Sequence, residues 1–295
     1  MAPFFMHDNF DTYLKVEKRY SNHTVIAYHH DVEQFFLFYG QRDLRIKEIN
    51  HSAIRTWIVD LFEKEVSRKT INRKLSSLRT YFKWLKKEGI VTANPLAKIS
   101  GPKSEKRLPQ FAKESELKKE KIEALFSADF EGIRDRLIFE LFYQTGIRLS
   151  ELIDLKDENV SPDRIKVFGK RQKERIIPIS NELSILINTY RSGREQIAQD
   201  SKFFFLLNNG KKLYPKFVYR KINNYLGSAT NLDKTSPHVL RHTFATHLLN
   251  NGAGLETLKD LLGHANLSAT QVYTHNSFAK LTQIYSQAHP RGRKN

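Results

Sequence analysis

A proline-bearing stretch about a third of the way along the chain most constrains the fold. The segment TANPLAKISGPKSEKRLPQ, residues 92–110, holds three prolines and one glycine and has almost no apolar periodicity. Each proline removes a backbone donor and biases the preceding residue away from helix. The sequence therefore predicts an N-terminal domain over residues 1–101, a linker over 102–109 and a second domain over 110–295. With 295 residues, each domain can bury its own core.

The first domain has the periodicity of helices. Ser21 is placed to cap a helix that ends at Gly40. A second helix is expected from about Thr70, with Gly89 as its stop, because apolar residues recur there at helical spacing. These apolar residues are Ile71, Leu75, Leu78, Phe82 and Leu85.

Basic side chains occupy the other faces of this second helix. An isolated basic face is usually only solvated, but here both domains are basic, so contacts with phosphate groups are favoured. Such contacts position a protein on a duplex without reading its sequence. The residues expected to make them are Arg73, Lys74, Arg79 and Lys83.

The second domain is predicted to be mostly helical with one β element. Ile165 and Val167 alternate with polar residues, a basic turn follows, and Ile177 and Ile179 alternate again. This pattern predicts a β-hairpin with a basic tip. Helices are expected over Ile133–Asp154 and from Glu182, Pro215, Pro237 and Leu255. The fold class is therefore mainly α with a small β-hairpin.

The charge of the chain narrows its possible partners. Lys and Arg number 49 against 32 Asp and Glu, a formal net charge of +17 with a pI near 9.8. The excess is shared, since residues 1–107 hold 20 basic and 12 acidic side chains and the rest hold 29 and 20. Such a balance favours a polyanion that both domains touch, nucleic acid first and an anionic membrane surface second.

Other classes of protein are disfavoured by what the sequence lacks. No run approaches 18 apolar residues, and the first residues do not resemble a secretory signal. There is no cysteine, which excludes disulfides, thiolate catalysis and cysteine-ligated zinc. These features fit a cytoplasmic protein without a membrane partner.

The short run HVLRH, residues 238–242, concentrates cationic groups. Ser236 and Pro237 form a good helix start, with serine as N-cap and proline at the first helical position. On a helix, His238, Arg241 and His242 share one face. Since free N–H groups at a helix start favour anions, this face is predicted to hold one.

Three further segments are unusually polar: TGIRLSEL, FGKRQKER and LLGHANLSATQVYTH. Arg148 follows an apolar helix and needs a partner, for which Glu151 is well placed. By itself this could be a simple ion pair. Lys170 could be a solvated turn residue, and His264 could cap a helix.

Three familiar chemistries find no support in the motifs. His238, His242 and His247 lack the HExxH pattern and have no nearby carboxylate, and the last two could be buried core histidines. A Walker-type phosphate loop is absent, as is the GxSxG elbow of serine hydrolases.

The remaining inventory suits metal-free phosphodiester transfer. Arginines clamp the non-bridging oxygens and stabilise the transition state. A nucleophile attacks in line while other groups move its proton and protonate the leaving oxygen. A tyrosine can serve as nucleophile if a base or cationic pocket helps, because its ordinary pKa is about 10. The candidate residues are Arg148, Lys170, His238, Arg241, His264 and Tyr273.

In this order and spacing, these residues closely resemble the tyrosine recombinase (phage integrase) family, with XerC- and XerD-like members nearest. The runs HVLRHTFATHLL, LLGH and YTH carry the resemblance, which covers essentially the whole chain. It implies an N-terminal helical core-binding domain of the SAM-like type. An α-rich catalytic domain with a small β-hairpin would follow.

The resemblance also implies roles. Arg148 and Arg241 would bind the scissile phosphate of duplex DNA. Tyr273 would attack it, forming a 3′-phosphotyrosyl bond and releasing a 5′-hydroxyl. Glu151 would hold Arg148 in position without itself contacting the phosphate.

Proton transfer is assigned in the same way. Lys170, on a hairpin that enters the minor groove, would protonate the leaving oxygen. His238 would assist proton transfer at Tyr273, and His264 would hydrogen-bond the phosphate. The family's hairpin usually reads GKG, whereas Arg171 replaces the second glycine here, and a Cβ restricts the turn. Arg171 and Lys173 are expected to contact DNA, Lys173 being a weaker candidate acid than Lys170.

Family members act without metal or cofactor, because the phosphotyrosyl bond stores the energy of the cut link. The resemblance implies a homo- or hetero-tetramer on paired DNA sites, with the helix after Tyr273 docking into a neighbouring subunit. A paralogous recombinase and a DNA translocase such as FtsK are possible further partners.

Chromosome dimer resolution is the favoured role, and three alternatives stay open. A mobile-element integrase or transposon recombinase of the same size would look much alike. A type IB topoisomerase uses similar chemistry, but its motifs differ from those here. A DNA-binding protein without catalysis is disfavoured because every expected catalytic position is filled.

Overall fold

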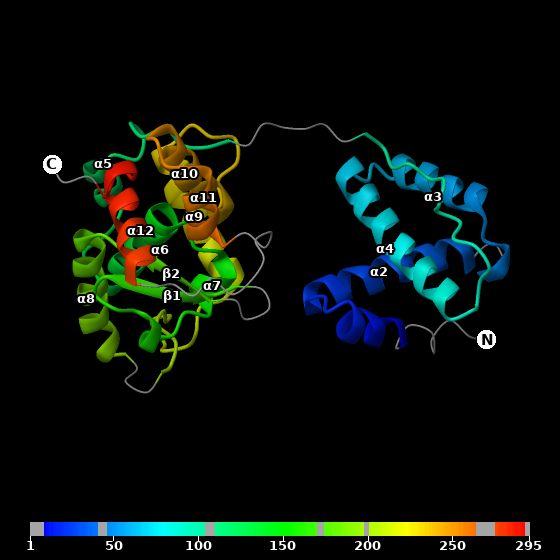
Figure 1. The fold of residues 1–295 in the computed structure, drawn as a ribbon, viewed down its shortest axis with the longest axis horizontal. Coiled ribbons are helices and arrows are strands. Elements are labelled where there is room, and N and C mark those ends of the chain that lie inside the picture. Colours follow the sequence, from blue (N-terminus) through cyan, green and yellow to red (C-terminus); the bar gives the residue numbers. More distant parts are fainter. Residues whose placement is uncertain are drawn as a thin grey trace. The chain divides into compact units, whose positions relative to one another are not determined.

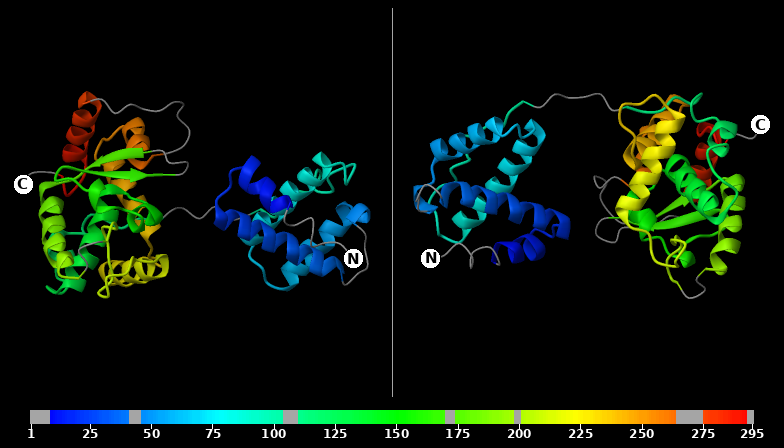
Figure 2. Two further views of the ribbon diagram at one scale, coloured as in Figure 1. Left: turned by 90° about the horizontal axis from the view of Figure 1, so that it is seen from below. Right: turned by 180° about the vertical axis from the view of Figure 1, so that it is seen from behind.

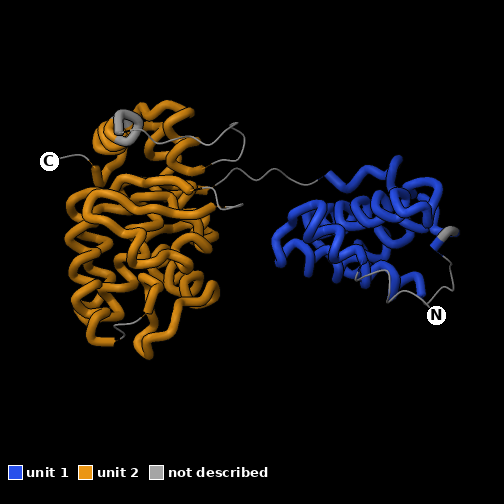
Figure 3. Tube along the Cα trace, turned by 60° about the horizontal axis from the view of Figure 1, so that its bottom comes forward, with its two compact units in different colours: residues 1–107 blue, residues 108–295 orange. Residues whose placement is uncertain are grey.

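The computed structural model describes residues 9–40, 46–103, 110–169, 174–197, 201–263 and 275–292. The chain divides into two compact units, residues 1–107 and 108–295 (Figure 3). Helices dominate both units, and each unit has its own apolar core.

The regular elements of the first unit, in its described part, are all helices (Figure 1). Its elements are η1 (Tyr13–Glu17), α2 (Asn22–Gly40), η2 (Ile46–Glu48), α3 (His51–Glu63) and α4 (Arg68–Lys87). The predicted end of α2 at Gly40 is confirmed. The helix expected from about Thr70 begins two residues earlier, because the Ser67 hydroxyl accepts a bond from the Thr70 N–H at 3.3 Å. Its predicted apolar stripe is buried against aromatic side chains of α2 and α3.

The second unit combines helices with a single hairpin in its described part. Its elements are α5 (Lys119–Glu123), α6 (Phe130–Thr145), α7 (Leu149–Ile153), η3 (Asp157–Asn159), β1 (Arg164–Phe168), β2 (Glu174–Pro178), α8 (Asn181–Glu195), α9 (Pro215–Ala229), α10 (Pro237–Asn250), α11 (Leu255–Leu262) and α12 (His275–Ala288). Helix α6 is almost wholly buried and packs against α8, α9 and α10. It is therefore the central helix of this core.

The predicted hairpin is confirmed. Strands β1 and β2 pair antiparallel, with Ile165 opposite Ile177 and Val167 opposite Arg175. Ile179 follows the end of β2. Figure 2 shows both strands close to α11 and α12, and β2 contacts both helices. Arg175 and Ile177 lie on the same, inward face of β2, so Arg175 faces the core of the second unit.

One helical expectation was wrong. The single helix predicted over Ile133–Asp154 is two helices, α6 and α7, joined by residues 146–148. Gly146 ends α6 in the left-handed conformation, with φ of 58°, and its N–H bonds to the Phe142 carbonyl at 3.1 Å. This turn places Arg148 at the N-cap of α7 rather than inside a helix.

Helix α12 packs on the second unit of its own chain. Leu281 and Tyr285 join a cluster with residues of α10 and α11. The Tyr285 hydroxyl donates to Gln144 Oε1 at 3.1 Å, and Arg291 pairs with buried Glu140 at 3.1 Å. These polar contacts fix the carboxyl end of α12 to α6.

Candidate active site

The predicted start of α10 is confirmed. Ser236 accepts a bond from the Val239 N–H at 3.4 Å, and Pro237 occupies the first helical position. His238 is exposed in the first turn, and Arg241 lies one turn further along, partly buried. The two side chains therefore share one face of α10.

Arg241 links two segments that are distant in the sequence. Its guanidinium donates to the Gly146 carbonyl and, at 2.7 Å, to the Leu262 carbonyl. Burial, together with the nearby cations of Arg148 and Arg175, lowers the pKa of Arg241 to about 9. The group is still a cation at neutral pH, and it is one for which a bound anion would be favourable.

Arg148 forms the ion pair expected of it. Its Nη1 lies 2.7 Å from Glu151 Oε1, and its backbone N–H donates to Glu151 Oε2 at 2.8 Å. Its Nη2 donates to the Gly263 carbonyl at 3.0 Å. About a third of the Arg148 side chain stays exposed, so it can still meet a ligand.

Arg175 was missed as a site residue. Its guanidinium binds Glu151 in a bidentate pair at 2.7 and 2.8 Å and donates from Nε to the Leu261 carbonyl at 2.9 Å. The signal was the strand alternation, which puts Arg175 on the inward face with Ile177. Burial would raise the pKa of Glu151, but bonds from Arg175 and Arg148 outweigh it and lower this pKa to about 2.

The carboxyl end of α11 is held by three arginines. The consecutive carbonyls of residues 261–263 accept, in order, from Arg175, Arg241 and Arg148. The last carbonyls of a helix lack partners within it and carry partial negative charge, so cations are favourable there. Gly263 ends α11 in the left-handed conformation, with φ of 63°.

This cluster carries an excess of positive charge. Arg148, Arg175 and Arg241 face one another, and Glu151 is the carboxylate that they share among the described residues. Two positive charges are therefore left without a carboxylate. An arrangement of this kind is suited to a phosphate or another anion, which arginine forks bind bidentately.

The other predicted residues of the site fall outside the described part of the chain. Lys170, Arg171 and Lys173 lie between the end of β1 and the start of β2. His264 and Tyr273 lie between α11 and α12.

The remaining histidines of α10 have structural surroundings. His247 is buried, with Nδ1 3.1 Å from the Tyr143 hydroxyl and Nε2 2.9 Å from the Ala112 carbonyl. The prediction that His247 could be a buried core histidine is therefore confirmed. His242 is partly buried near the Phe111 ring, and burial lowers its pKa.

The phosphate contacts predicted on the basic helix of the first unit, α4, need one correction. Lys74 is buried, and its ammonium lies 3.0 Å from Asp31 and also bonds to Gln34. It is therefore committed to an internal ion pair that joins α4 to α2. Arg73 also pairs with Asp31 but stays 44% exposed, and Arg79 and Lys83 are exposed as well.

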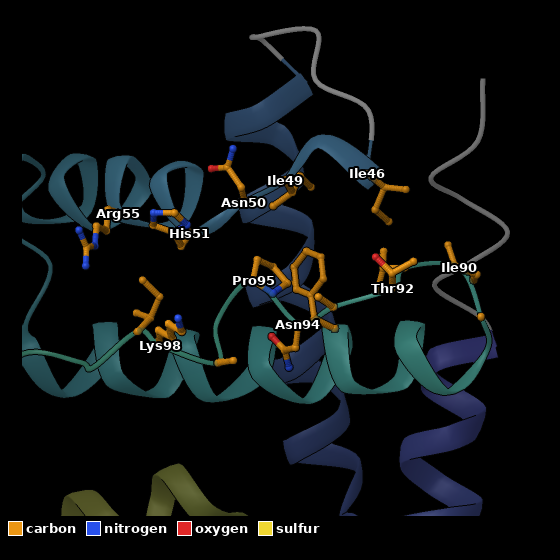
Figure 4. A pocket seen from close by; sticks show the side chains of 16 residues that line it. Ile46, Ile49, Asn50, His51, Arg55, Ile90, Thr92, Asn94, Pro95 and Lys98 are labelled. Carbon is orange, nitrogen blue, oxygen red and sulfur yellow. The ribbon is translucent and has the colours of Figure 1, made fainter.

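The first unit also contains a pocket of about 710 Å³ (Figure 4). It lies between the start of α3 and residues 89–99, with His51, Arg55 and Lys98 in its lining. None of the predicted catalytic residues lines it.

No cluster of His, Asp or Glu among the described residues is arranged to hold a metal ion. No helix in the described ranges is long and apolar enough to cross a bilayer.

Comparison with known families gives matches in both units. The "Phage integrase family" matches residues 115–280, and the "Phage integrase, N-terminal SAM-like domain" matches residues 8–89. Tyrosine recombinase XerC of Staphylococcus haemolyticus is 39% identical over 288 residues, covering 95% of each chain. Tyrosine recombinase XerC of Anoxybacillus flavithermus is 38% identical over 294 residues, covering 96% of each.

Solved structures share the fold. XerH site-specific recombinase bound to palindromic difH substrate aligns with a TM-score of 0.72 at 22% identity, covering 89% of this chain and 79% of that one. A lambda integrase dimer bound to a core site aligns with a TM-score of 0.65 at 18% identity, covering 92% and 100%.

These matches define the class of protein. The chain belongs to the phage integrase family, the tyrosine recombinases. It is a site-specific recombinase, an enzyme that cleaves and rejoins DNA.

Proposed function

We propose that this recombinase cuts DNA at the arginine cluster, with Tyr273 as the nucleophile. The two uncompensated positive charges of the arginine cluster support this most strongly, since a scissile phosphodiester would balance one of them and its doubly charged pentavalent transition state both. Both arginines also hold carbonyls at the end of α11, where the segment leading to Tyr273 begins. Binding the phosphate and placing the nucleophile thus depend on the same side chains.

The chemical step is a transfer of the phosphoryl group from one oxygen to another. The Tyr273 oxygen forms a bond to phosphorus as the bond to the 5′-oxygen breaks, which leaves a 3′-phosphotyrosyl link. His238 takes up the phenolic proton, and Lys170 protonates the departing 5′-oxygen. His264 hydrogen-bonds the phosphate. The reverse reaction with a new 5′-hydroxyl rejoins the strand, so the cycle consumes no ATP and needs no metal or other cofactor.

Contacts with the DNA backbone hold the duplex in place. In the first unit we assign them to Arg73, Arg79 and Lys83, which are exposed on α4, and not to buried Lys74. In the second unit we assign them to Arg171 and Lys173. These contacts would add affinity that falls steeply with salt.

The biological role we propose is Xer-type resolution of chromosome dimers in the cytoplasm. It is supported by relatives named Tyrosine recombinase XerC that are 37–39% identical over nearly the whole chain. The working assembly would be a tetramer on two paired sites, of one or two kinds of subunit. A paralogous recombinase and a translocase such as FtsK would be its partners. A mobile-element recombinase of the same family is the second candidate, since transposon integrases share the fold.

A plasmid assay tests this role. The substrate is a supercoiled plasmid with two direct copies of a candidate dimer-resolution site, incubated with the protein alone and with a paralogous recombinase and translocase. Two product circles are expected. Relaxed plasmid without product circles would indicate a topoisomerase, and activity confined to transposon ends would indicate the mobile-element role.

A further inference from the structure

Arg175 makes contacts that a structural ion pair alone does not require. It lies on β2, is only 3% exposed, and uses Nε and both terminal nitrogens in hydrogen bonds. Two of these bonds reach Glu151, and the third reaches the Leu261 carbonyl. A single rigid guanidinium therefore sets where Glu151 and the end of α11 lie relative to each other.

Both partners of Arg175 belong to the site. Glu151 is the carboxylate that orients Arg148, and α11 ends immediately before the segment that carries His264 and Tyr273. Arg148 and Arg241 also bond to the end of α11, but the proposed phosphate would compete for their donors. Each of the three guanidinium nitrogens of Arg175 already donates a hydrogen bond within the protein. Its link to α11 therefore does not depend on the DNA.

The packing around Gly263 supports a close fit at this point. A Cβ on Gly263 would lie 3.0 Å from Arg175 Cδ and 3.3 Å from its Nη1. The end of α11 thus approaches the arginine more closely than a residue with a Cβ ordinarily would.

We propose that Arg175 is a positioning residue of the recombination reaction. It holds the carboxyl end of α11, and hence the start of the segment leading to Tyr273, in register with Arg148 and Arg241. It touches neither DNA nor the reacting atoms. The inference rests on the proposed function of this site.

The test is Arg175→Lys in the full-length protein, which keeps the charge but cannot form the fork. Arg191→Lys is the matched control, since Arg191 likewise bonds one carboxylate, Asp157 at 3.1 Å, and a carbonyl, Val160 at 2.7 Å, away from the site. Measured quantities are DNA affinity, melting temperature and the single-turnover rate of covalent adduct formation on a nicked duplex.

If Arg175→Lys misplaces the nucleophile, its rate of adduct formation should be roughly 100-fold lower than that of wild type, while its DNA affinity should stay within about threefold. Arg191→Lys, whose pair with Asp157 is partly exposed, is expected to lower the melting temperature less and to leave the adduct rate unchanged. Replacing the leaving 5′-oxygen of the substrate by sulfur removes the need for an acid. This substrate should restore adduct formation by Lys170→Ala but not by Arg175→Lys.

Four results would overturn the inference. An adduct rate in Arg175→Lys within threefold of wild type is one, and full restoration by the sulfur substrate is another, because it would make Arg175 part of the acid. Absence of adduct from the wild type would overturn the proposed function together with the inference. If Arg175→Lys does not fold, Gly263→Ala replaces it. That variant keeps the charge but presses on Arg175, and an unchanged adduct rate in it contradicts the proposal.

Discussion

Glu151 is the residue on which the charge balance of the site depends. Its carboxylate accepts bonds from the Arg148 backbone and side chain and from both terminal nitrogens of Arg175. Without it, two guanidinium groups would remain in partly or fully buried positions with no counterion. Removing one partner of a buried pair is far more costly than the pair is stabilising.

We therefore expect Glu151→Gln to destabilise the second unit in a pH-dependent way. The pKa of Glu151 falls from 4.5 to about 2 on folding, which corresponds to about 3 kcal/mol of stability. A lowered pKa contributes fully above pH 4.5, and the contribution is lost as the pH falls towards 2. The difference in unfolding free energy between wild type and variant should narrow over that interval.

Urea unfolding followed by circular dichroism measures this difference. Both tryptophans, Trp57 and Trp84, lie in the first unit, so their fluorescence reports that unit separately. The control is Glu182→Gln, which loses an exposed pair with Lys119 and should change little. A Glu151→Gln effect that did not vary between pH 6 and pH 3 would contradict the assigned pKa.

Arg241→Ala is expected to separate chemistry from binding. Losing one donor group to the transition state should slow cleavage by about 10² to 10³-fold. Binding to duplex DNA should weaken much less, since many other phosphate contacts remain. Arg164→Ala is the control, because Arg164 is a partly exposed arginine paired with Asp163 in the same unit. Equal losses of affinity and rate in Arg241→Ala would instead indicate a purely binding role.

At this scale the sequence predicted the Arg148–Glu151 pair and the one-sided placement of His238 and Arg241, because both depend on a spacing of three residues along the chain. It did not predict the partners of Lys74 and Arg175. Those partners, Asp31 and Glu151, belong to other elements, and helical or strand periodicity contains no information about contacts between elements. The burial of such a cation can be recognised only when the position of its carboxylate partner in the fold is known.

At the scale of elements, the turn at Gly146 builds the site. Its φ of 58° ends α6, places Arg148 at the start of α7 and presents the Gly146 carbonyl to Arg241. The sequence predicted most of the helix starts, since Ser236, Pro237 and Pro215 are strong local signals. The helix expected over Ile133–Asp154 ran through Gly146, although a glycine after an apolar run is a local stop signal and Arg148 was expected to follow a helix.

Gly146→Ala is expected to destabilise the second unit by about 2 to 5 kcal/mol. The left-handed conformation costs about 1 to 2 kcal/mol with a Cβ, and overpacking adds about 1 to 3 kcal/mol. The overpacking arises because the Cβ would lie 2.5 Å from Phe244 Cδ1 and 2.9 Å from Leu262 Cδ2.

Gly252→Ala is the matched control for Gly146→Ala. Gly252 has φ of 89° with nothing within 4 Å of its Cβ position, so it isolates the backbone cost. Urea unfolding of both variants gives the comparison. Equal losses of stability would show that the contacts with Phe244 and Leu262 do not matter. Slower cleavage is also expected in Gly146→Ala alone, because the carbonyl that Arg241 binds would shift.

At the scale of the whole molecule, both helical units are basic. The net charge of +17 is divided between them, which suits two units that contact one duplex. The division of the chain and its helical class follow from the prolines of residues 92–110 and from periodicity. The identity of the DNA site does not, since it depends on base contacts and DNA deformability rather than on the charge of the protein.

We propose above all that Tyr273 attacks a phosphate held by the arginine cluster. The most direct measurement incubates wild type and Tyr273→Phe, in EDTA, with nicked duplexes carrying candidate dimer-resolution sites, and resolves covalent adducts on a denaturing gel. We predict an adduct in wild type, none in Tyr273→Phe, and nearly equal DNA binding by both. An adduct that persists in Tyr273→Phe, or one that forms in wild type only with added Mg²⁺, would contradict this mechanism.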